Sequence, residues 1–154
     1  MQPGDEAPQF TLPDETGVPV SLSDFAGGGL VIYFYPRAFT PGCTLQACDL
    51  RDRHDLFTAA GYSVVGISPD PVSRLARFRD KHDLPFPVLS DQHHTAAKAY
   101  GAWGTKRSFG KEHEGIIRST FVIGPDGRIL EAWKNVRSGG HADRLLAAIG
   151  DAVG

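Results

Sequence analysis

The chain has 154 residues and a formal net charge of −2, and 41% of its residues are hydrophobic. This length and composition favour one folded domain over residues 1–154 rather than two domains or a disordered chain. The near balance of charge argues against a dedicated nucleic-acid binder. No apolar run reaches the roughly 20 residues of a membrane-spanning helix. The first ten residues, MQPGDEAPQF, lack the layout of a secretory signal, so we expect a cytoplasmic protein.

The first half of the chain alternates between strand and helix patterns. Its strongest signal is the apolar run GLVIYFY, which is typical of a central strand buried on both faces. The elements predicted here are a hairpin of Phe10–Leu12 and Val18–Val20, strands at Gly29–Tyr35 and Tyr62–Ile67, and helices at Thr40–Ala59 and Pro71–His82.

The second half ends in a hairpin followed by a helix. The Asp126-Gly127 dipeptide is a strong hairpin signal. The elements predicted here are strands at Phe86–Leu89, Ser119–Ile123 and Ile129–Trp133, helices at Thr95–Tyr100 and His141–Ile149, and a loop over residues 101–117. This order predicts an α/β fold of the thioredoxin-like type, with a mixed central sheet flanked by helices and an N-terminal β-hairpin.

The segment PRAFTPGCTLQAC carries the candidate chemistry, because it places a cysteine in the first turn of a helix that follows a buried strand. Thr40 is a favourable N-cap and Pro41 suits the first helical position, which makes Cys43 the third helical residue. Unpaired amide donors and the positive end of the helix dipole favour a thiolate there. Ligand crevices of α/β sheets also form at the carboxyl ends of strands.

A second cysteine, Cys48, lies five residues further along the same predicted helix. In an ideal helix the two Cα atoms would be about 8.6 Å apart, whereas a disulfide needs roughly 4.4–6.8 Å. The pair therefore predicts a two-state device, in which Cys43 reacts in the folded helix and the first turns then unwind so that Cys48 can reach it.

These residues resemble the peroxiredoxin motif Pro-x-x-x-Thr-x-x-Cys, here Pro36, Thr40 and Cys43. The continuation to Cys48 is similar to the bacterioferritin-comigratory-protein or Q-type subgroup, whose members use two cysteines of one chain. The similarity extends to the segments PGDEAPQFTL, VVGISPDP, FPVLSD, YGAWG, GIIRSTFVI and GGHADRLL.

The resemblance implies a role for each motif residue. Cys43 would be the peroxidatic cysteine and Cys48 the resolving cysteine. Thr40 would hydrogen-bond the thiolate and the peroxide, and Pro36 would shield the sulfur from water. Arg118 matches the family arginine that stabilises the thiolate and the transition state. The backbone amides of Gly42 and Cys43 would bind the substrate.

The resemblance also implies the reaction, a thiol-dependent reduction of hydrogen peroxide and organic hydroperoxides. A sulfenic acid would form on Cys43 and condense with Cys48 to a disulfide, which thioredoxin or a glutaredoxin-like dithiol would reduce. We expect a monomer that needs no cofactor or metal and binds neither nucleic acid nor membrane. None of the six histidines shows metal-ligand spacing with another histidine or a cysteine.

Three residues depart from the subgroup pattern, and one of them, Gly124, replaces a frequent Asp before the Pro125-Asp126-Gly127 turn. Gln46 stands where the subgroup usually has Glu, which removes a negative charge near the thiolate. Phe39 stands where Asp or another polar residue is frequent, which makes the pocket mouth more apolar.

Two other functions remain open at this point. The first is a thiol–disulfide oxidoreductase of the thioredoxin class without peroxide reduction, although such proteins usually carry Cys-x-x-Cys. The second is a non-enzymatic binding or holdase module, which predicts that the Cys43→Ser variant keeps its function.

Overall fold

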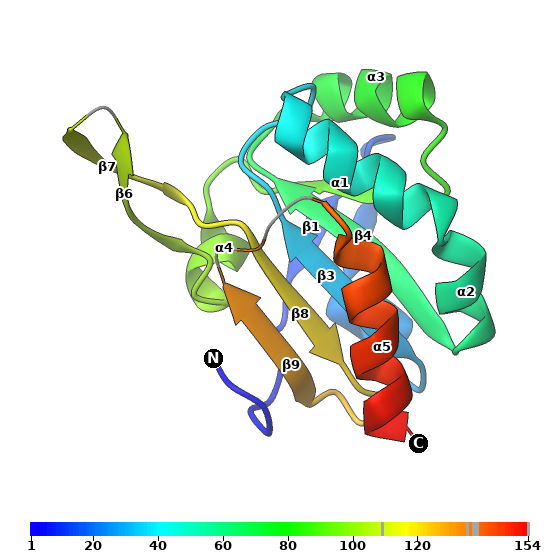
Figure 1. Cartoon of the computed structure of the whole chain (residues 1–154). Helices are drawn as coiled ribbons and strands as arrows, with labels where there is room; N and C mark the ends of the chain where they lie inside the picture. Colours follow the sequence, from blue (N-terminus) through cyan, green and yellow to red (C-terminus); the bar gives the residue numbers. More distant parts are fainter. Residues whose placement is uncertain (109, 135, 137–138, 154) are drawn as a thin grey trace.

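The computed structural model describes residues 1–108, 110–134, 136 and 139–153. Its centre is a five-stranded mixed sheet in the order β5-β4-β3-β8-β9 (Figure 1). Strands β3, β4 and β5 are parallel, β8 pairs antiparallel with β3, and β9 pairs antiparallel with β8. The bounds are β3 Gly29–Phe34, β4 Tyr62–Ser68, β5 Val88–Ser90, β8 Ser119–Ile123 and β9 Ile129–Lys134. The predicted thioredoxin-like sheet is thus confirmed.

Strand β3 is buried on both faces, as its continuous apolar run predicted. Val31 and Tyr33 face one side of the sheet, and Ile32 and Phe34 face the other. Each face has its own hydrophobic core, so β3 joins the two layers and gives the carboxyl end of the sheet a rigid base.

Four helices cover the first face and contribute buried side chains to its core: α1 Pro41–Asp52, α2 His54–Ala59, α3 Val72–His82 and α5 His141–Val153. Helices α1 and α5 lie side by side (Figure 1). The other face is covered by α4 Thr95–Ala99, the short 3-10 helix η1 Leu22–Phe25 and the segment around Phe10. The predicted N-terminal hairpin is present as β1 Thr11–Pro13 and β2 Pro19–Ser21.

The single helix predicted from Thr40 to Ala59 is wrong, because the chain forms two helices, α1 and α2, that are separated at Arg53. The backbone of Arg53 leaves the helical region at φ −111° and ψ 7°. Its guanidinium pairs with Asp143 of α5 at 3.1 Å. Neither Gly nor Pro marks this break, and the bend allows Phe57 of α2 to reach the core.

The loop predicted over residues 101–117 is also wrong. This segment forms an antiparallel ribbon of β6 Trp103–Ser108 and β7 Lys111–Ile116, which projects from the body of the protein (Figure 1). The first four residues of β7 are exposed. A ribbon that is solvated on both faces has no alternation of apolar and polar residues, so the usual strand signal is missing.

The remaining predicted bounds agree with the structure to within a few residues. The largest of these differences is at the last helix, α5, which continues from the predicted Ile149 to Val153. The short strand predicted at Phe86–Leu89 is shifted to Val88–Ser90.

Candidate active site

The sulfur of Cys43 lies at the carboxyl end of the central strand, in the first turn of α1. Strand β3 ends at Phe34, and the next amide, that of Tyr35, still donates to Ile67 O of β4 at 3.1 Å. Helix α1 then begins at Pro41, as its position after a good N-cap residue predicted. Cys43 is only 1% exposed. A buried thiol at this position faces the uncapped donors of the helix start.

Arg118 brings a positive charge to that thiol. Its Nη2 donates a hydrogen bond to Cys43 Sγ at 3.1 Å. The contact follows from sheet register, because Ser119, the next residue, pairs with Phe34 at the end of β3. The backbone carbonyl of Arg118 also accepts a hydrogen bond from Val136 N at 3.0 Å. The structure therefore joins two of the predicted site residues that are far apart in sequence.

Gln46 holds the other side of the same guanidinium, and its role was missed in the sequence. Arg118 Nη1 donates to Gln46 Oε1 at 2.6 Å. Gln46 is fully buried and lies three residues after Cys43, on the same face of α1. This spacing was the available signal, but the sequence showed Gln46 only as a loss of charge.

Thr40 is the N-cap residue of α1, as predicted, but its side chain does not cap the helix. Its hydroxyl instead donates to Arg37 O at 2.7 Å. Its carbonyl accepts the first bond of the helix, from Thr44 N at 2.9 Å. The amides of Gly42 and Cys43 therefore lie in the first turn without the expected side-chain acceptor. Since a hydroxyl has a single proton, the oxygen of Thr40 remains available as an acceptor.

The loop before α1 is fixed by an ion pair that sequence analysis also missed. Asp70, which follows β4, accepts from Ala38 N at 2.8 Å and pairs with Arg74 Nε at 3.2 Å. Arg74 Nη2 returns a hydrogen bond to Ala38 O at 2.8 Å. Between this clamp and Thr40, Phe39 adopts φ +67°, a conformation that bulky residues rarely take. Pro36 is half-buried in the same loop.

Cys48 has a different environment in the second half of α1. Its sulfur is half-buried and lies 3.8 Å from Nδ1 of His82, the last residue of α3. Both cysteines are free thiols. Helix α1 is continuous between them, so the ideal separation of about 8.6 Å between their Cα atoms applies and excludes a bond in this conformation.

Two buried titratable groups near the site stay neutral. Burial raises the pKa of Tyr33 well above its usual value, so this phenol keeps its proton. Burial, assisted by the charges of Arg144 and Arg118, lowers the pKa of His141 to about 4. The Nε2 atom of His141 lies 2.9 Å from Thr120 Oγ1 on β8. Arg118, which donates a hydrogen bond to Cys43, is therefore a charged neighbour of this thiol, whereas Tyr33 and His141 are not charged.

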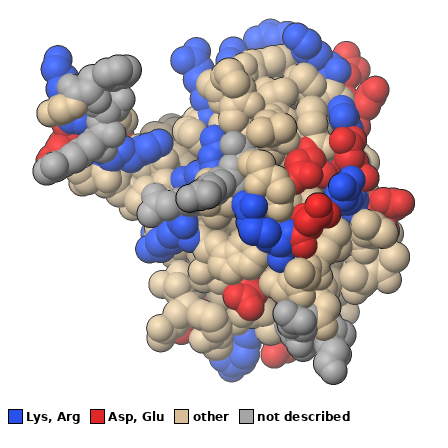
Figure 2. All heavy atoms as spheres, viewed as in Figure 1, with Lys and Arg blue, Asp and Glu red and all other residues tan. Residues whose placement is uncertain are grey.

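The outer surface of the helical layer carries mixed charge. Figure 2 shows acidic and basic side chains interspersed over the helices of this face. The pair formed by Arg51 and Asp52, at 3.0 Å, illustrates this pattern on α1. Within the described part of the chain no cluster of three or more His, Cys, Asp or Glu side chains could hold a metal ion.

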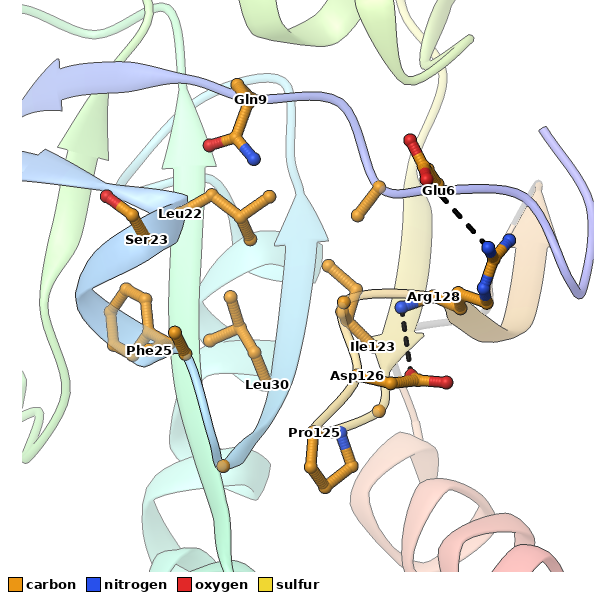
Figure 3. A pocket seen from close by; sticks show the side chains of 15 residues that line it. Glu6, Gln9, Leu22, Ser23, Phe25, Leu30, Ile123, Pro125, Asp126 and Arg128 are labelled. Carbon is orange, nitrogen blue, oxygen red and sulfur yellow. Dashed lines mark hydrogen bonds and ion pairs between the residues drawn. The ribbon is translucent and has the colours of Figure 1, made fainter.

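A surface pocket of about 390 Å³ lies at the opposite end of β3, away from both cysteines. Figure 3 shows an apolar floor that includes Leu22, Phe25 and Leu30, and a polar rim where Arg128 pairs with Glu6 at 3.8 Å. No cysteine is among the residues that line this pocket.

A buried cysteine beside an arginine, in the first turn of a helix on a thioredoxin-like sheet, defines a thiol-dependent oxidoreductase. The chain belongs to the AhpC/TSA family, whose model matches residues 3–132. The chain is similar in sequence and structure to peroxiredoxins of the Bcp and PrxQ type. The protein is accordingly a thiol-dependent peroxidase.

Several relatives show how far the similarity extends. The chain is 53% identical to a peroxiredoxin of Mycobacterium tuberculosis over 94% of this chain and 92% of the relative. It is 44% identical to peroxiredoxin Bcp of Escherichia coli K12 over 95% and 94% of the two chains. Nearly the whole of each protein is therefore shared.

Solved structures agree with this assignment. Bacterioferritin comigratory protein of Xanthomonas campestris, studied for alkyl peroxide reduction, matches with a TM-score of 0.89 and 36% identity over 94% and 92% of the two chains. A cysteine-to-serine mutant of Xylella fastidiosa PrxQ matches with a TM-score of 0.94 and 32% identity over 100% and 98%. No helix in the described residues is long and apolar enough to cross a membrane.

Proposed function

We propose that Cys43 is the peroxidatic cysteine and that Arg118 and the start of α1 drive its reaction with a hydroperoxide. The observation that carries this proposal is the 3.1 Å hydrogen bond from Arg118 Nη2 to a buried sulfur. A guanidinium is always charged and presents several fixed donors, so it can stabilise both the thiolate and the charge that develops during the reaction.

In the first step the thiolate of Cys43 attacks the terminal oxygen of a hydroperoxide. The O–O bond breaks, a sulfenic acid remains on Cys43, and the leaving oxygen takes up a proton to become water or an alcohol. The amides of Gly42 and Cys43 and the Arg118 guanidinium donate toward the developing negative charge. Because the proton of Thr40 is held by Arg37 O, the oxygen of Thr40 accepts the hydroperoxide O–H.

Pro36 and the loop around it exclude water from the thiolate. The residue is half-buried directly after the central strand, and the loop is fixed by Asp70 and Arg74. A dry site strengthens the electrostatic contribution of Arg118.

In the second step Cys48 resolves the sulfenic acid. The first turns of α1 unwind, the two sulfurs form a disulfide, and water leaves. An external dithiol, thioredoxin or a glutaredoxin-like protein, then restores both thiols by exchange. Substrates are hydrogen peroxide and organic hydroperoxides. Because both cysteines belong to one chain, the cycle needs no second subunit, and we expect a monomer acting in the reducing cytoplasm.

The test is peroxide consumption by the pre-reduced protein, with Cys43→Ser and Cys48→Ser as variants. With thioredoxin as the reductant, the wild type should turn over repeatedly, Cys43→Ser should fall to background, and Cys48→Ser should stop after about one turnover. Repeated turnover by Cys43→Ser would overturn the assignment of the peroxidatic cysteine. Repeated turnover by Cys48→Ser would overturn the intramolecular disulfide.

A further inference from the structure

His82 is the side chain placed to exchange a proton with Cys48. Its Nδ1 lies 3.8 Å from Cys48 Sγ, within the range of a hydrogen bond to sulfur. The two residues are 34 positions apart in sequence and meet because α3 ends beside the middle of α1. The first turn of α1, where Cys43 reacts, has no contact with this imidazole among the described interactions.

Two aromatic rings pack near the imidazole, and a hydrogen bond holds the backbone of the same residue. Its ring packs edge-on against the ring of Phe78, with 5.2 Å between the ring centroids. The centroid of the Phe39 ring is 6.3 Å away. Arg51, one turn after Cys48, donates from Nη1 to the backbone carbonyl of His82 at 2.8 Å. The ring therefore packs beside the sulfur, and the hydrogen bond from Arg51 joins α1 to the end of α3.

The charges that face His82 keep the ring neutral. Helix α1 contributes Arg51 and the Cys48 thiol, and α3 contributes the adjacent Lys81. Asp83, the next residue after His82, interacts with Arg51. Partial burial and the two cations lower the pKa of His82 from its usual value. A neutral imidazole with its proton on Nε2 offers Nδ1 as a proton acceptor.

We propose that His82 is the general base that deprotonates Cys48 during disulfide formation. This proposal rests on the proposed function, in which Cys48 resolves the sulfenic acid of Cys43. The Arg51 guanidinium, whose own pKa is raised by its hydrogen bond to Asp52 and, more weakly, by attraction to Cys48, favours the thiolate that results.

The proton balance of the step is complete. Nδ1 of His82 takes the proton of the Cys48 thiol, and the thiolate attacks the sulfur of the Cys43 sulfenic acid. The S–O bond breaks as the S–S bond forms, and the hydroxide that leaves is protonated by the imidazolium to give water. In the later reduction of the disulfide, His82 can relay a proton from the attacking dithiol to Cys48 as Cys48 leaves as a thiolate.

The first experiment follows disulfide formation after one equivalent of hydrogen peroxide, by rapid acid quench and mass spectrometry. At pH 7 only about 3% of an ordinary thiol is ionised, so His82→Asn should slow this step by up to about 30-fold. At pH 9 the deficit should shrink, because the thiol ionises without help. Formation of the sulfenic acid should keep its wild-type rate.

His54→Asn is the matched control, since His54 is also half-buried and packs on an aromatic ring, that of Phe86, at 6.0 Å. This variant should form the disulfide at the wild-type rate. A His82→Asn protein with the wild-type rate at pH 7 would overturn the proposal. A deficit of equal size at pH 9 would also overturn it, because a structural defect does not depend on thiol ionisation.

A second experiment does not depend on peroxide chemistry. In a Cys43→Ser background, Cys48 is alkylated with iodoacetamide across the same pH range, with and without His82→Asn. The loss of His82 should slow alkylation about 10-fold at pH 7 and little at pH 9. If the wild type forms no disulfide but alkylation depends on His82, the proposed function fails and the pairing stands. If alkylation is unchanged, the pairing itself is wrong.

Discussion

The two halves of helix α1 carry the same functional group in opposite settings. In the first turn, the Cys43 sulfur is buried and bonded to an arginine that stays charged through the cycle. In the second half, the Cys48 sulfur is half-buried and lies beside an imidazole whose lowered pKa favours the neutral, proton-accepting form. The comparison shows how one helix can place two thiols beside different partners, an arginine and an imidazole.

The partners that create this difference come from separate parts of the fold. Arg118 precedes β8 and is 75 residues from Cys43, whereas His82 ends α3. Each half of α1 is therefore tuned by a different element, and each can be altered alone.

The largest expected effect comes from removing the arginine of the first half. Arg118→Gln should slow the second-order reaction with hydrogen peroxide by about 10²–10³-fold, because it removes a preorganised charged donor at the reacting sulfur. Stopped-flow measurement of single-turnover oxidation checks this. The alkylation rate of Cys48 should be unchanged. If the oxidation of Cys43 and the alkylation of Cys48 were both slowed, the two halves of α1 would not be independent.

The next effect concerns His141, the buried histidine at the start of α5 that contacts Thr120 of β8. His141 has its pKa lowered from its usual 6.5 to about 4, so the unfolded chain binds a proton more readily between these values. Stability contributed by neutral His141 is complete above pH 6.5 and declines by about 3 kcal/mol as pH falls to about 4.

Urea unfolding of the wild type and of His141→Asn across this range measures the effect. The variant should be less stable at pH 7 because it loses core packing, but its stability should fall less steeply with acid. Parallel curves for the two proteins would show that His141 does not carry the pH dependence.

The smallest effect concerns the amide that holds Arg118. Gln46→Leu leaves Nη1 of the arginine without its buried acceptor and should slow peroxide reduction about 10-fold. Gln46→Glu keeps an acceptor oxygen and should remain close to the wild type. If both variants fall equally, the packing of Gln46 matters more than its hydrogen bond.

The sequence predicted the fold well where apolar periodicity was strong. The run at β3 and the apolar faces of α3 and α5 are examples, because burial imposes a visible pattern on such segments. It failed on the β6–β7 ribbon, where strand pairing gives no apolar alternation, and on the helix break at Arg53, which neither Gly nor Pro marks.

The candidate site divides in the same way. The positions of Thr40 and Cys43 at the start of α1 depend on local sequence, so the rules for helix starts predicted them. Arg118 was predicted only from the resemblance to the family. The contact between His82 and Cys48 depends on how α3 meets α1, and no spacing in the sequence encodes it. Thr40 was correctly predicted as the N-cap residue, but its side chain does not cap the helix because the carbonyl of Arg37 takes its hydroxyl proton.

The left-handed backbone of Phe39 has a consequence for how the enzyme resets. Its conformation is sustained by the clamp of Asp70 and Arg74 on the residue before it, so the loop resists deformation. Arg51 anchors the far part of α1 to the end of α3 in the same manner. The unwinding proposed above would thereby be confined to the part of α1 between these two anchored points. In the proposed cycle, the first turns of α1 would re-form after each disulfide is reduced, and the central sheet would not need to rearrange.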